Sequence, residues 1–271
     1  FFNPKSIAIV GATNRPGTWG YFVMLGLTGG QIPGMPTEPG PPFEGAIYPV
    51  NHKSDKIFDL KAYKSILDIP DPVDTAVVSV PETHIEQVIR ECGEKGIKGV
   101  SIITSGFGES VEGGKEREEA LAEMARSYGT RLVGPNVGGA FNLRINFNTT
   151  TTASDASGRR QLQPTPISAI CQGGFAIFDL IISGHERKMG FGKFIQTGNE
   201  ADLKASDFLE YFGQDPETEC IAMYLEGIRN IPRFRELAQE ISKKKPIVAL
   251  KAGRTKGGTR AAQSHTSAMA G

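Results

Sequence analysis

Short apolar runs alternate with longer stretches of helical apolar spacing along the first part of the chain. The short runs are typical of buried strands, and the longer stretches are typical of helices that lay one apolar face on a sheet. Alternation of the two predicts a parallel, doubly wound α/β sheet. The predicted strands are residues 6–10, 46–50, 75–80, 99–103 and 131–133, and the predicted helices begin near Gly17, Glu82 and Gly113.

The same alternation returns after a polar stretch at residues 148–166, which contains a run of threonines and two prolines. A stretch of this composition predicts a linker, so we expect one domain at residues 1–147 and another at residues 167–271. The second domain should hold a second, smaller parallel sheet. Its predicted strands are residues 167–171, 192–196, 220–225 and 246–250, and its predicted helices are residues 172–188, 205–212 and 232–243.

The first strand is followed by Gly11, Ala12 and Thr13, and further glycines open the helix behind them. A strand that feeds a glycine turn and a helix N-terminus turns backbone amides toward a phosphate, which predicts a nucleotide-type ligand. The glycine spacing is not the dinucleotide fingerprint. Asn51 and Lys53 follow the second strand, where an NAD site would present an acidic residue to the ribose. They favour a ligand with an extra phosphate, coenzyme A or NADP, over the alternatives of a plain tight turn and a solvated lysine.

Three more strands end at the same edge of the predicted sheet, which is the edge where parallel α/β sheets bind ligands. Val80 and Pro81 follow one strand, Thr104 follows the next, and Asn136 lies in the loop after the third. These residues are small, polar or rigid, and we include them in the candidate site. His84, in the first turn of a helix, is predicted to be a surface residue.

The second domain offers a different kind of site. Gly173 and Gly174 open a predicted helix, whose N-terminal amides form an anion site that carries no net charge. Glu226 and, after a basic glycine-rich loop, His265 lie beyond the ends of other strands. A neutral imidazole can attack phosphorus, a carboxylate can hold its other ring nitrogen, and glycine amides can bind the phosphoryl oxygens. The alternatives are a surface histidine and an exposed loop carboxylate.

Composition narrows the class of partner. Thirty basic and thirty acidic residues cancel, so no overall field draws the chain to nucleic acid or to an anionic membrane. The most apolar run is interrupted by Asp179 and is too short to span a bilayer, and no cleavable leader opens the chain, so we expect a soluble, cytoplasmic protein. Cys92, Cys171 and Cys220 are predicted to be reduced core thiols, and no cluster of metal ligands is evident. A first residue other than methionine and an end at Gly271 predict a fragment of something longer.

Several short motifs, spread over almost the whole chain, are specific in combination. They are Phe2-Asn3-Pro4-Lys5-Ser6 with Gly11-Ala12, Tyr48-Pro49-Val50-Asn51, Val80-Pro81, Gly134-Pro135-Asn136, Gly198-Asn199-Glu200-Ala201-Asp202, Tyr224-Leu225-Glu226-Gly227, and Lys251-Ala252-Gly253-Arg254-Thr255 with Ser264-His265-Thr266. With these motifs the chain resembles the α portion of the nucleoside-diphosphate-forming acyl-CoA synthetases, relatives of the succinyl-CoA synthetase α subunit.

The resemblance implies a Rossmann-like domain that binds coenzyme A, followed by a flavodoxin-like domain that carries a phosphohistidine. In this family acyl-CoA and phosphate give an acyl phosphate, whose phosphoryl group passes to the histidine and then to ADP or GDP, reversibly. His265 is implied to be the phosphoryl carrier and Glu226 its stabilising partner, with phosphate bound by Gly173, Gly174 and Ser264. The implied coenzyme-binding residues are Gly11, Ala12, Thr13, Asn51, Lys53, Val80, Pro81, Thr104 and Asn136.

The resemblance also implies partners. The family's nucleotide, ATP or ADP (or GTP or GDP) with Mg²⁺, is handled by an ATP-grasp portion, which this chain lacks. We therefore expect an ATP-grasp β subunit or fused domain as the partner, a small carboxylic acid as the substrate, and an oligomer.

Three departures from the family stand in the sequence. Gly173 replaces a common serine and Ser267 a common glycine, which removes or shifts hydroxyl contacts to phosphate. Residues 31–45 form a long loop rich in proline and glycine, which is either a ligand-facing lid or, as we favour, a surface insertion. Two other functions stay open. A coenzyme A-binding regulatory module of an acetyltransferase relative tends to lack a histidine such as His265, and an NADP-dependent oxidoreductase has no evident use for it.

Overall fold

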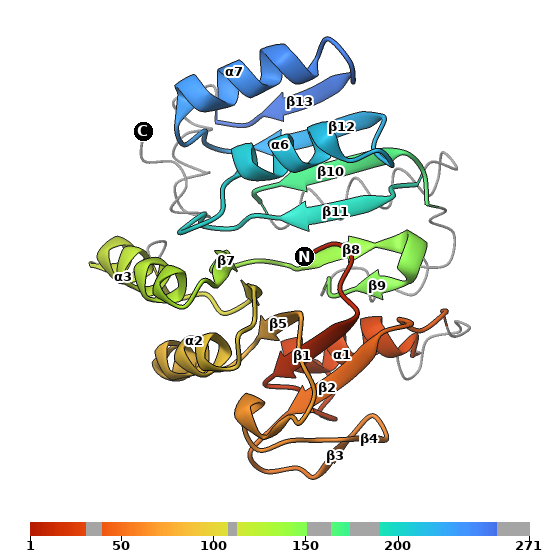
Figure 1. Cartoon of the computed structure of the whole chain (residues 1–271), viewed down its shortest axis with the longest axis vertical. Coiled ribbons are helices and arrows are strands. Elements are labelled where there is room, and N and C mark those ends of the chain that lie inside the picture. The colour runs from red at the N-terminus through yellow and green to blue at the C-terminus, as the bar shows by residue number, and fades with distance from the viewer. Residues whose placement is uncertain (31–39, 108–112, 151–163, 174–189, 254–271) are drawn as a thin grey trace.

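The structure is a computed structural model that describes residues 1–30, 40–107, 113–150, 164–173 and 190–253. Within these residues the chain forms two main sheets with helices packed on them, stacked one above the other in Figure 1.

The first half of the chain forms a five-stranded parallel sheet. Its elements are β1 (Ser6–Val10), α1 (Trp19–Thr28), β2 (Ala46–Val50), β5 (Thr75–Val78), α2 (Ile85–Glu94), β6 (Gly99–Ile102), α3 (Gly114–Ser127) and β7 (Arg131–Val133). The strand order is β2-β1-β5-β6-β7, so the winding direction reverses between β1 and β5. Every predicted strand and helix of this half is confirmed, with ends that differ by a few residues.

The two faces of this sheet bury different partners, because successive side chains of a strand point to opposite faces. Ile7 and Ile9 of β1 pack with residues of α1 and of the second half of the chain. Ala8 and Val10 pack in another cluster, with residues of α2 and α3. Both faces are therefore covered, as a parallel sheet requires.

Three short elements of this half were not predicted. They are the strands β3 (Lys56–Ile57) and β4 (Leu60–Lys61), which form a hairpin, and the 3₁₀ helix η1 (Ile66–Asp68). Elements of two or three residues span too little chain to repeat a hydrophobic pattern, which is why periodicity does not predict them. A further 3₁₀ helix, η2 (Glu82–His84), forms the first turn of the helix predicted from Glu82.

The second half forms a mixed sheet of six strands. Its elements are β8 (Ala140–Asn142), η3 (Leu143–Ile145), β9 (Phe147–Asn148), β10 (Ile167–Cys171), β11 (Lys193–Gln196), α6 (Ala205–Gln214), β12 (Cys220–Leu225), α7 (Ile231–Ile241) and β13 (Ile247–Lys251). The strand order is β13-β12-β10-β11-β8-β9. The four strands from β10 to β13 pair in parallel, and β8 pairs antiparallel with both β11 and β9.

The expectation of a smaller, wholly parallel second sheet is therefore wrong. The short strands β8 and β9 extend it to six strands, one more than the first sheet has. The chain thus enters the second sheet at Ala140, before the predicted linker at residues 148–166. The sequence does not predict this early entry, because β8 and β9 are too short to show a hydrophobic pattern. The predicted helix over residues 172–188 lies, from Gly174 on, outside the described residues.

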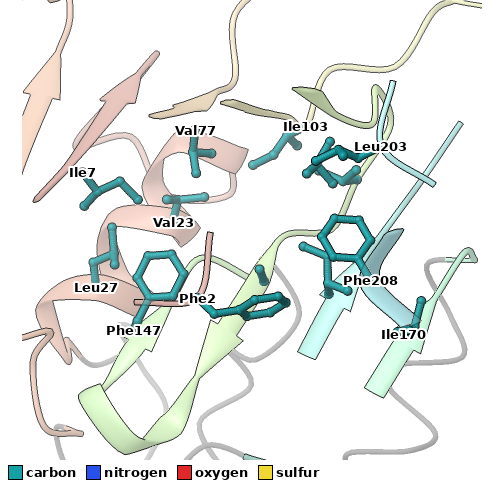
Figure 2. Close-up of a cluster of buried hydrophobic side chains, with 14 of the residues drawn as sticks. Phe2, Ile7, Val23, Leu27, Val77, Ile103, Phe147, Ile170, Leu203 and Phe208 are labelled. Carbon is teal, nitrogen blue, oxygen red and sulfur yellow. The ribbon is translucent and has the colours of Figure 1, made fainter. Parts of the chain in front are cut away.

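A hydrophobic cluster joins the two halves (Figure 2). Ile7 and Val77 contribute to it from the first sheet, Ile170 from the second sheet, and Phe208 from α6. Phe2 lies among them, with its ring centroid 6.3 Å from that of Phe208 in an edge-on arrangement. Because the apolar side chains of both halves are buried against one another, the two sheets share a core.

The loop that follows β11 is also bound to the first half, through Asp202. Its side chain is inaccessible to solvent and accepts hydrogen bonds from Arg126 Nη1 (2.9 Å), Arg131 Nε (2.8 Å) and the Leu132 amide (2.9 Å). Burial opposes ionisation of Asp202, but these donors hold its pKa below the usual value. The Leu203 amide also donates to the Leu132 carbonyl at 3.1 Å. Asp202 and Leu203 of this loop are therefore fixed against α3 and β7.

Two further observations bear on the class of protein. No helix in the described part of the chain is long and apolar enough to cross a membrane. Cys92, Cys171 and Cys220 are free thiols, as expected, but Cys220 is only partly buried. Burial raises the pKa of Cys92 and Cys171 to about 12. Both stay protonated at neutral pH and behave as core residues.

Candidate functional site

A cleft of about 700 Å³ opens beside the carboxyl ends of β1, β2 and β5. The strand order reverses at this point, and ligands of open α/β sheets bind where it does. Five predicted residues line the cleft, and they are Gly11, Asn51, Lys53, Val80 and Pro81. The prediction of a ligand site at this edge thus coincides with a space large enough for a nucleotide-sized group.

The turn after β1 passes very close to the loop after β5. A Cβ on Gly11, whose φ is +95°, would lie 2.2 Å from the Ser79 carbonyl oxygen. A Cβ on Gly20, at the start of α1, would lie 2.0 Å from the Gly11 carbonyl oxygen. Glycine is thus required at both positions for strand, turn and helix to pack, and the turn brings the backbone to the wall of the cleft.

Asn51 holds this wall together. Its Oδ1 accepts from the backbone amides of Lys53 (2.8 Å) and Ser54 (3.2 Å), and its Nδ2 donates to the Ala12 carbonyl at 2.8 Å. The side chain therefore fixes the turn after β2 against the turn after β1. Ala12 is buried and Thr13 accepts a hydrogen bond from the amide of Arg15, and neither lines the cleft.

Charged and polar residues that the sequence analysis missed complete the cleft. Lys64 lies at its rim with Lys53, and Lys64 Nζ contacts Asp55 Oδ1 at 2.6 Å. Glu91, from α2, accepts hydrogen bonds from Ser65 Oγ (2.8 Å) and Gln87 Nε2 (2.9 Å). The additional lining residues with polar side chains are His52, Lys64, Ser65, Ser79, His84, Gln87 and Glu91.

Part of this wall could have been found from the sequence. Residues 84, 87, 88 and 91 recur at helical spacing, so they share one face of a helix. His84 is exposed, as predicted, but it also lines the cleft. Lys64 and Ser65 follow the short hairpin, for which the sequence gives no signal.

Thr104 and Asn136 lie apart from the cleft lining. Thr104 Oγ1 donates to the Val80 carbonyl at 2.7 Å, and the Thr104 carbonyl accepts from the Asn136 amide at 3.0 Å. Asn136 Nδ2 donates to Asn199 Oδ1 at 3.4 Å, across the contact between the two halves. Thr104 therefore contacts the backbone of Val80, which lines the cleft, and Asn136 contacts the loop that follows β11.

A second group of predicted residues meets at the carboxyl ends of β10 and β12. Gly173 follows β10, Glu226 follows β12, and both are buried. A Cβ on Gly173 would lie 2.4 Å from Glu226 Oε1, so the carboxylate fills the space that a larger residue would need. The structure therefore brings Glu226 and Gly173 together, and Glu226 is a buried carboxylate in place of an exposed loop residue.

The end of β13 approaches the same place. Lys251 Nζ donates to the carbonyl oxygens of Glu226 (2.6 Å) and Ala252 (2.7 Å), and the Ala252 amide donates to the Leu225 carbonyl at 2.8 Å. The chain thus leaves the sheet beside Glu226 on its way to the predicted His265 loop. Gly174, Ser264 and His265 themselves lie outside the described residues.

The described ranges contain no candidate metal site. Among those residues no three or more His, Cys, Asp or Glu side chains are placed to hold a metal ion.

Two family models match the chain in succession. The CoA binding domain matches residues 5–140, and the succinyl-CoA ligase like flavodoxin domain matches residues 164–271. The first match covers the five-stranded sheet with its cleft. The second covers β10 to β13 with Glu226, and extends over the residues that contain His265.

Individual proteins are similar over the whole chain. The α subunit of the ADP-forming acetate–CoA ligase II of Pyrococcus furiosus is 42% identical over 271 residues, which are 100% of this chain and 55% of that subunit. The ADP-forming 4-hydroxybutyrate–CoA ligase of Nitrosopumilus maritimus is 35% identical over 274 residues, which cover 99% of this chain and 36% of that protein.

A solved structure shows the same arrangement of elements. The dinucleotide-forming acetyl-coenzyme A synthetase 1 of Ca. Korarchaeum cryptofilum, in complex with phosphate and ADP, superimposes with a TM-score of 0.86 at 38% identity. The match covers 100% of this chain and 55% of that one. The chain thus spans about half the length of the α subunit and of the solved protein that it matches.

Proposed function

Because the chain belongs to the family of nucleoside-diphosphate-forming acyl-CoA synthetases, as their α portion, we propose that it binds coenzyme A and carries a phosphoryl group on His265. The predicted fold, a Rossmann-like domain followed by a flavodoxin-like one, agrees with the two family models. The predicted domain limits, residues 1–147 and 167–271, stay a prediction, and the strands β8 and β9 at residues 140–148 pair in the second sheet.

The proposed reaction runs in three reversible steps. Phosphate attacks the thioester carbonyl of an acyl-CoA, the C–S bond breaks, and an acyl phosphate and coenzyme A form. The imidazole of His265 then attacks phosphorus, the bond from phosphorus to the acyl oxygen breaks, and the carboxylate leaves. Finally a terminal oxygen of the nucleoside diphosphate attacks the same phosphorus, the P–N bond breaks, and the triphosphate forms.

The contact of Glu226 with Gly173 carries this proposal. A buried carboxylate beside the loop that leads to His265 is suited to accept a hydrogen bond from one imidazole nitrogen, which leaves the other nitrogen free to attack. The same carboxylate favours the positive charge that develops on the ring during attack. Gly173 adds a backbone amide without a side chain, and with Gly174 and Ser264 it is proposed to bind the phosphoryl oxygens.

The cleft at β1, β2 and β5 is the proposed coenzyme site. Lys53 and Lys64 supply cations at its rim for the anionic nucleotide part of coenzyme A. Gly11, Val80 and Pro81 shape the wall that the ligand packs against. The other residues that were predicted to bind the coenzyme support this wall in our proposal, and they are Ala12, Thr13, Asn51, Thr104 and Asn136.

A nucleotide-binding partner completes the proposed enzyme. The chain spans 55% of an α subunit and 36% of a longer relative, so we propose an ATP-grasp domain or subunit that binds ATP or ADP, or GTP or GDP, with Mg²⁺. The relatives are named for acetate and 4-hydroxybutyrate, which supports a small carboxylic acid as the substrate. We also propose an oligomer, and the cytoplasm as its compartment, where free thiols stay reduced.

Phosphorylation from the nucleotide side tests the proposal. The full-length protein with its ATP-grasp partner is mixed with γ-labelled ATP, and acid-labile, base-stable label is measured on this chain. We expect label on the wild type and none on His265→Asn. An active partner that leaves the wild type unlabelled, or a labelled His265→Asn variant, contradicts the phosphohistidine.

Coenzyme A binding is tested independently by calorimetry, with NADP as the control ligand. Heat from coenzyme A alone supports the proposed site. Heat from NADP alone supports the oxidoreductase alternative, and binding of coenzyme A without any phosphorylation supports a regulatory module.

A further inference from the structure

Gln172 holds both of the backbone amides that follow β12. It is completely buried between β10 and Gly173. Its side-chain Oε1 accepts from the amide of Glu226 at 2.6 Å and from the amide of Gly227 at 2.9 Å. Its own backbone amide donates to the Tyr224 carbonyl at 3.0 Å. The Gln172 side chain thus holds the backbone amides of the segment that bears the Glu226 carboxylate, while Lys251 Nζ holds the Glu226 carbonyl.

The other end of the Gln172 side chain is fixed as well. Its Nε2 donates to Glu200 Oε1 at 2.9 Å, and this oxygen also accepts from Thr197 Oγ1 (2.9 Å) and from the Ala205 amide (3.0 Å). Glu200 is 1% exposed and has a φ of +57° in the loop after β11. That loop is the one clamped to the first half of the chain through Asp202. A rigid carboxylate therefore sets the orientation of the Gln172 amide.

Glutamine is the side chain that this place requires. The two backbone amides are donors, so the oxygen of the side chain must face them, and Glu200 is an acceptor, so a donor must face it. Asparagine is one methylene shorter. Glutamate keeps the acceptor toward Glu226 and Gly227 but sets a second carboxylate 2.9 Å from that of Glu200, and two such groups do not both ionise.

We propose that Gln172 is the positioning residue of Glu226, and that Glu200 orients the Gln172 amide for this purpose. The inference rests on the proposed phosphohistidine, because Glu226 acts there on His265. Gln172 does not touch the phosphoryl group in this account. It sets the place of the Glu226 carboxylate, which lies against Gly173, by holding the backbone on which that carboxylate stands.

The variants Gln172→Glu and Gln172→Ala test this in the full-length protein with its ATP-grasp partner. The phosphorylation rate at saturating ATP should fall about tenfold or more in both, since small displacements of a reacting group cost that much, while the KM for ATP stays within about twofold. The amides of Glu226 and Gly227 should exchange with deuterium faster in Gln172→Ala than in the wild type.

The pH profile of Gln172→Glu separates positioning from a general loss of packing. On acidification one of the two facing carboxylates takes up a proton, and the resulting O–H restores a donor between residues 172 and 200. The positive charge of Arg229 acts on Glu200, and Glu226 is the other acid beside the site. Relative to the wild type at the same pH, the rate of Gln172→Glu should recover from pH 8 to pH 6, and that of Gln172→Ala should not.

Ser168→Ala is the matched control. Ser168 is a buried polar residue near the opposite end of β10, with its Oγ 2.7 Å from Thr218 Oγ1. Its loss should lower stability without changing the phosphorylation rate by more than about twofold. Wild-type rates in both Gln172 variants, or no recovery of Gln172→Glu at low pH, overturn the inference and leave the proposed function standing. A wild type that takes no label with an active partner overturns the proposed function, whereas the exchange of the Glu226 and Gly227 amides still reports on Gln172.

Discussion

Oε1 of Glu226 lies 2.4 Å from the point that a Cβ on Gly173 would occupy. The two residues follow neighbouring parallel strands, 53 positions apart in sequence, and they meet because β10 and β12 pair directly. The Glu226 carboxylate therefore occupies the space that a side chain at position 173 would need.

Gly173→Ala should displace that carboxylate and lower the phosphorylation rate of His265 about tenfold, because the reacting groups lose their alignment. Gly173→Ser adds the same Cβ but also a hydroxyl that can donate to the carboxylate, so it should retain more activity than Gly173→Ala. Single-turnover labelling of the two variants checks this. Equal rates in Gly173→Ala and the wild type would show that the contact has no part in the reaction.

Lys53→Ala should weaken coenzyme A binding about tenfold, because it removes a cation from the rim of the cleft. Lys56→Ala is the matched control, since Lys56 pairs with Asp59 on the surface at 2.9 Å and does not line the cleft. Calorimetry at two salt concentrations gives the affinities. If Lys53 faces the extra phosphate, Lys53→Ala should weaken the binding of dephospho-coenzyme A less than that of coenzyme A. Equal losses from Lys53→Ala and Lys56→Ala would contradict the assignment.

Asp202→Asn should lower the free energy of unfolding by about 2 kcal/mol, since it weakens charge-assisted hydrogen bonds to a buried acceptor. The pKa of Asp202 is lowered in the fold, so its contribution is present at neutral pH and is lost as acid protonates it below about pH 4. Denaturant titrations at pH 7 and in acid measure both effects. Glu86→Gln, which removes an exposed ion pair with Arg90, is the control and should cost less than about 0.5 kcal/mol. If Asp202→Asn lowers the free energy of unfolding at pH 7 no more than Glu86→Gln does, the hydrogen bonds of Asp202 do not hold the two halves together.

Glu200→Gln should raise stability at pH 8. Burial raises the pKa of Glu200, so the fold favours its protonated form, and stability falls as pH rises from the usual carboxyl range through that raised pKa. The amide keeps the acceptor at Oε1 and has no charge to desolvate. The gain over the wild type should therefore shrink toward pH 4. A gain that is constant with pH, or a loss at pH 8, would argue against a buried ionisable group.

The course of the chain was largely predictable, because each long strand and helix carries its own hydrophobic period. Ser6–Val10, Ala46–Val50 and Cys220–Leu225 are strands whose bounds the pattern gave without error. The hairpins of β3 with β4 and β8 with β9 were not predictable, because their strands of two or three residues are too short to repeat a hydrophobic pattern. Their positions matter, since β8 carries the chain into the second sheet ahead of the predicted linker.

The candidate site was predictable only where ligand chemistry follows a strand end. Gly11, Lys53 and Glu226 satisfy that rule, and the structure places each at a cleft or buried contact. Asn136 satisfies it equally well but contacts Asn199, 63 positions away. No local pattern separates a loop that meets a ligand from a loop that meets another loop, because the difference lies in how the two sheets pack.

The central claim is that this chain carries a phosphoryl group on His265 between an acyl phosphate and a nucleotide. The most direct measurement starts from the acyl side: the full-length protein with its partner is given acetyl-CoA and radiolabelled phosphate without nucleotide, and the labelled peptide is identified by mass spectrometry. We expect acid-labile label on the peptide that contains His265, and none in His265→Asn. Label that persists in His265→Asn, or its absence from a wild type that forms ATP from acetyl-CoA, ADP and phosphate, would contradict the account.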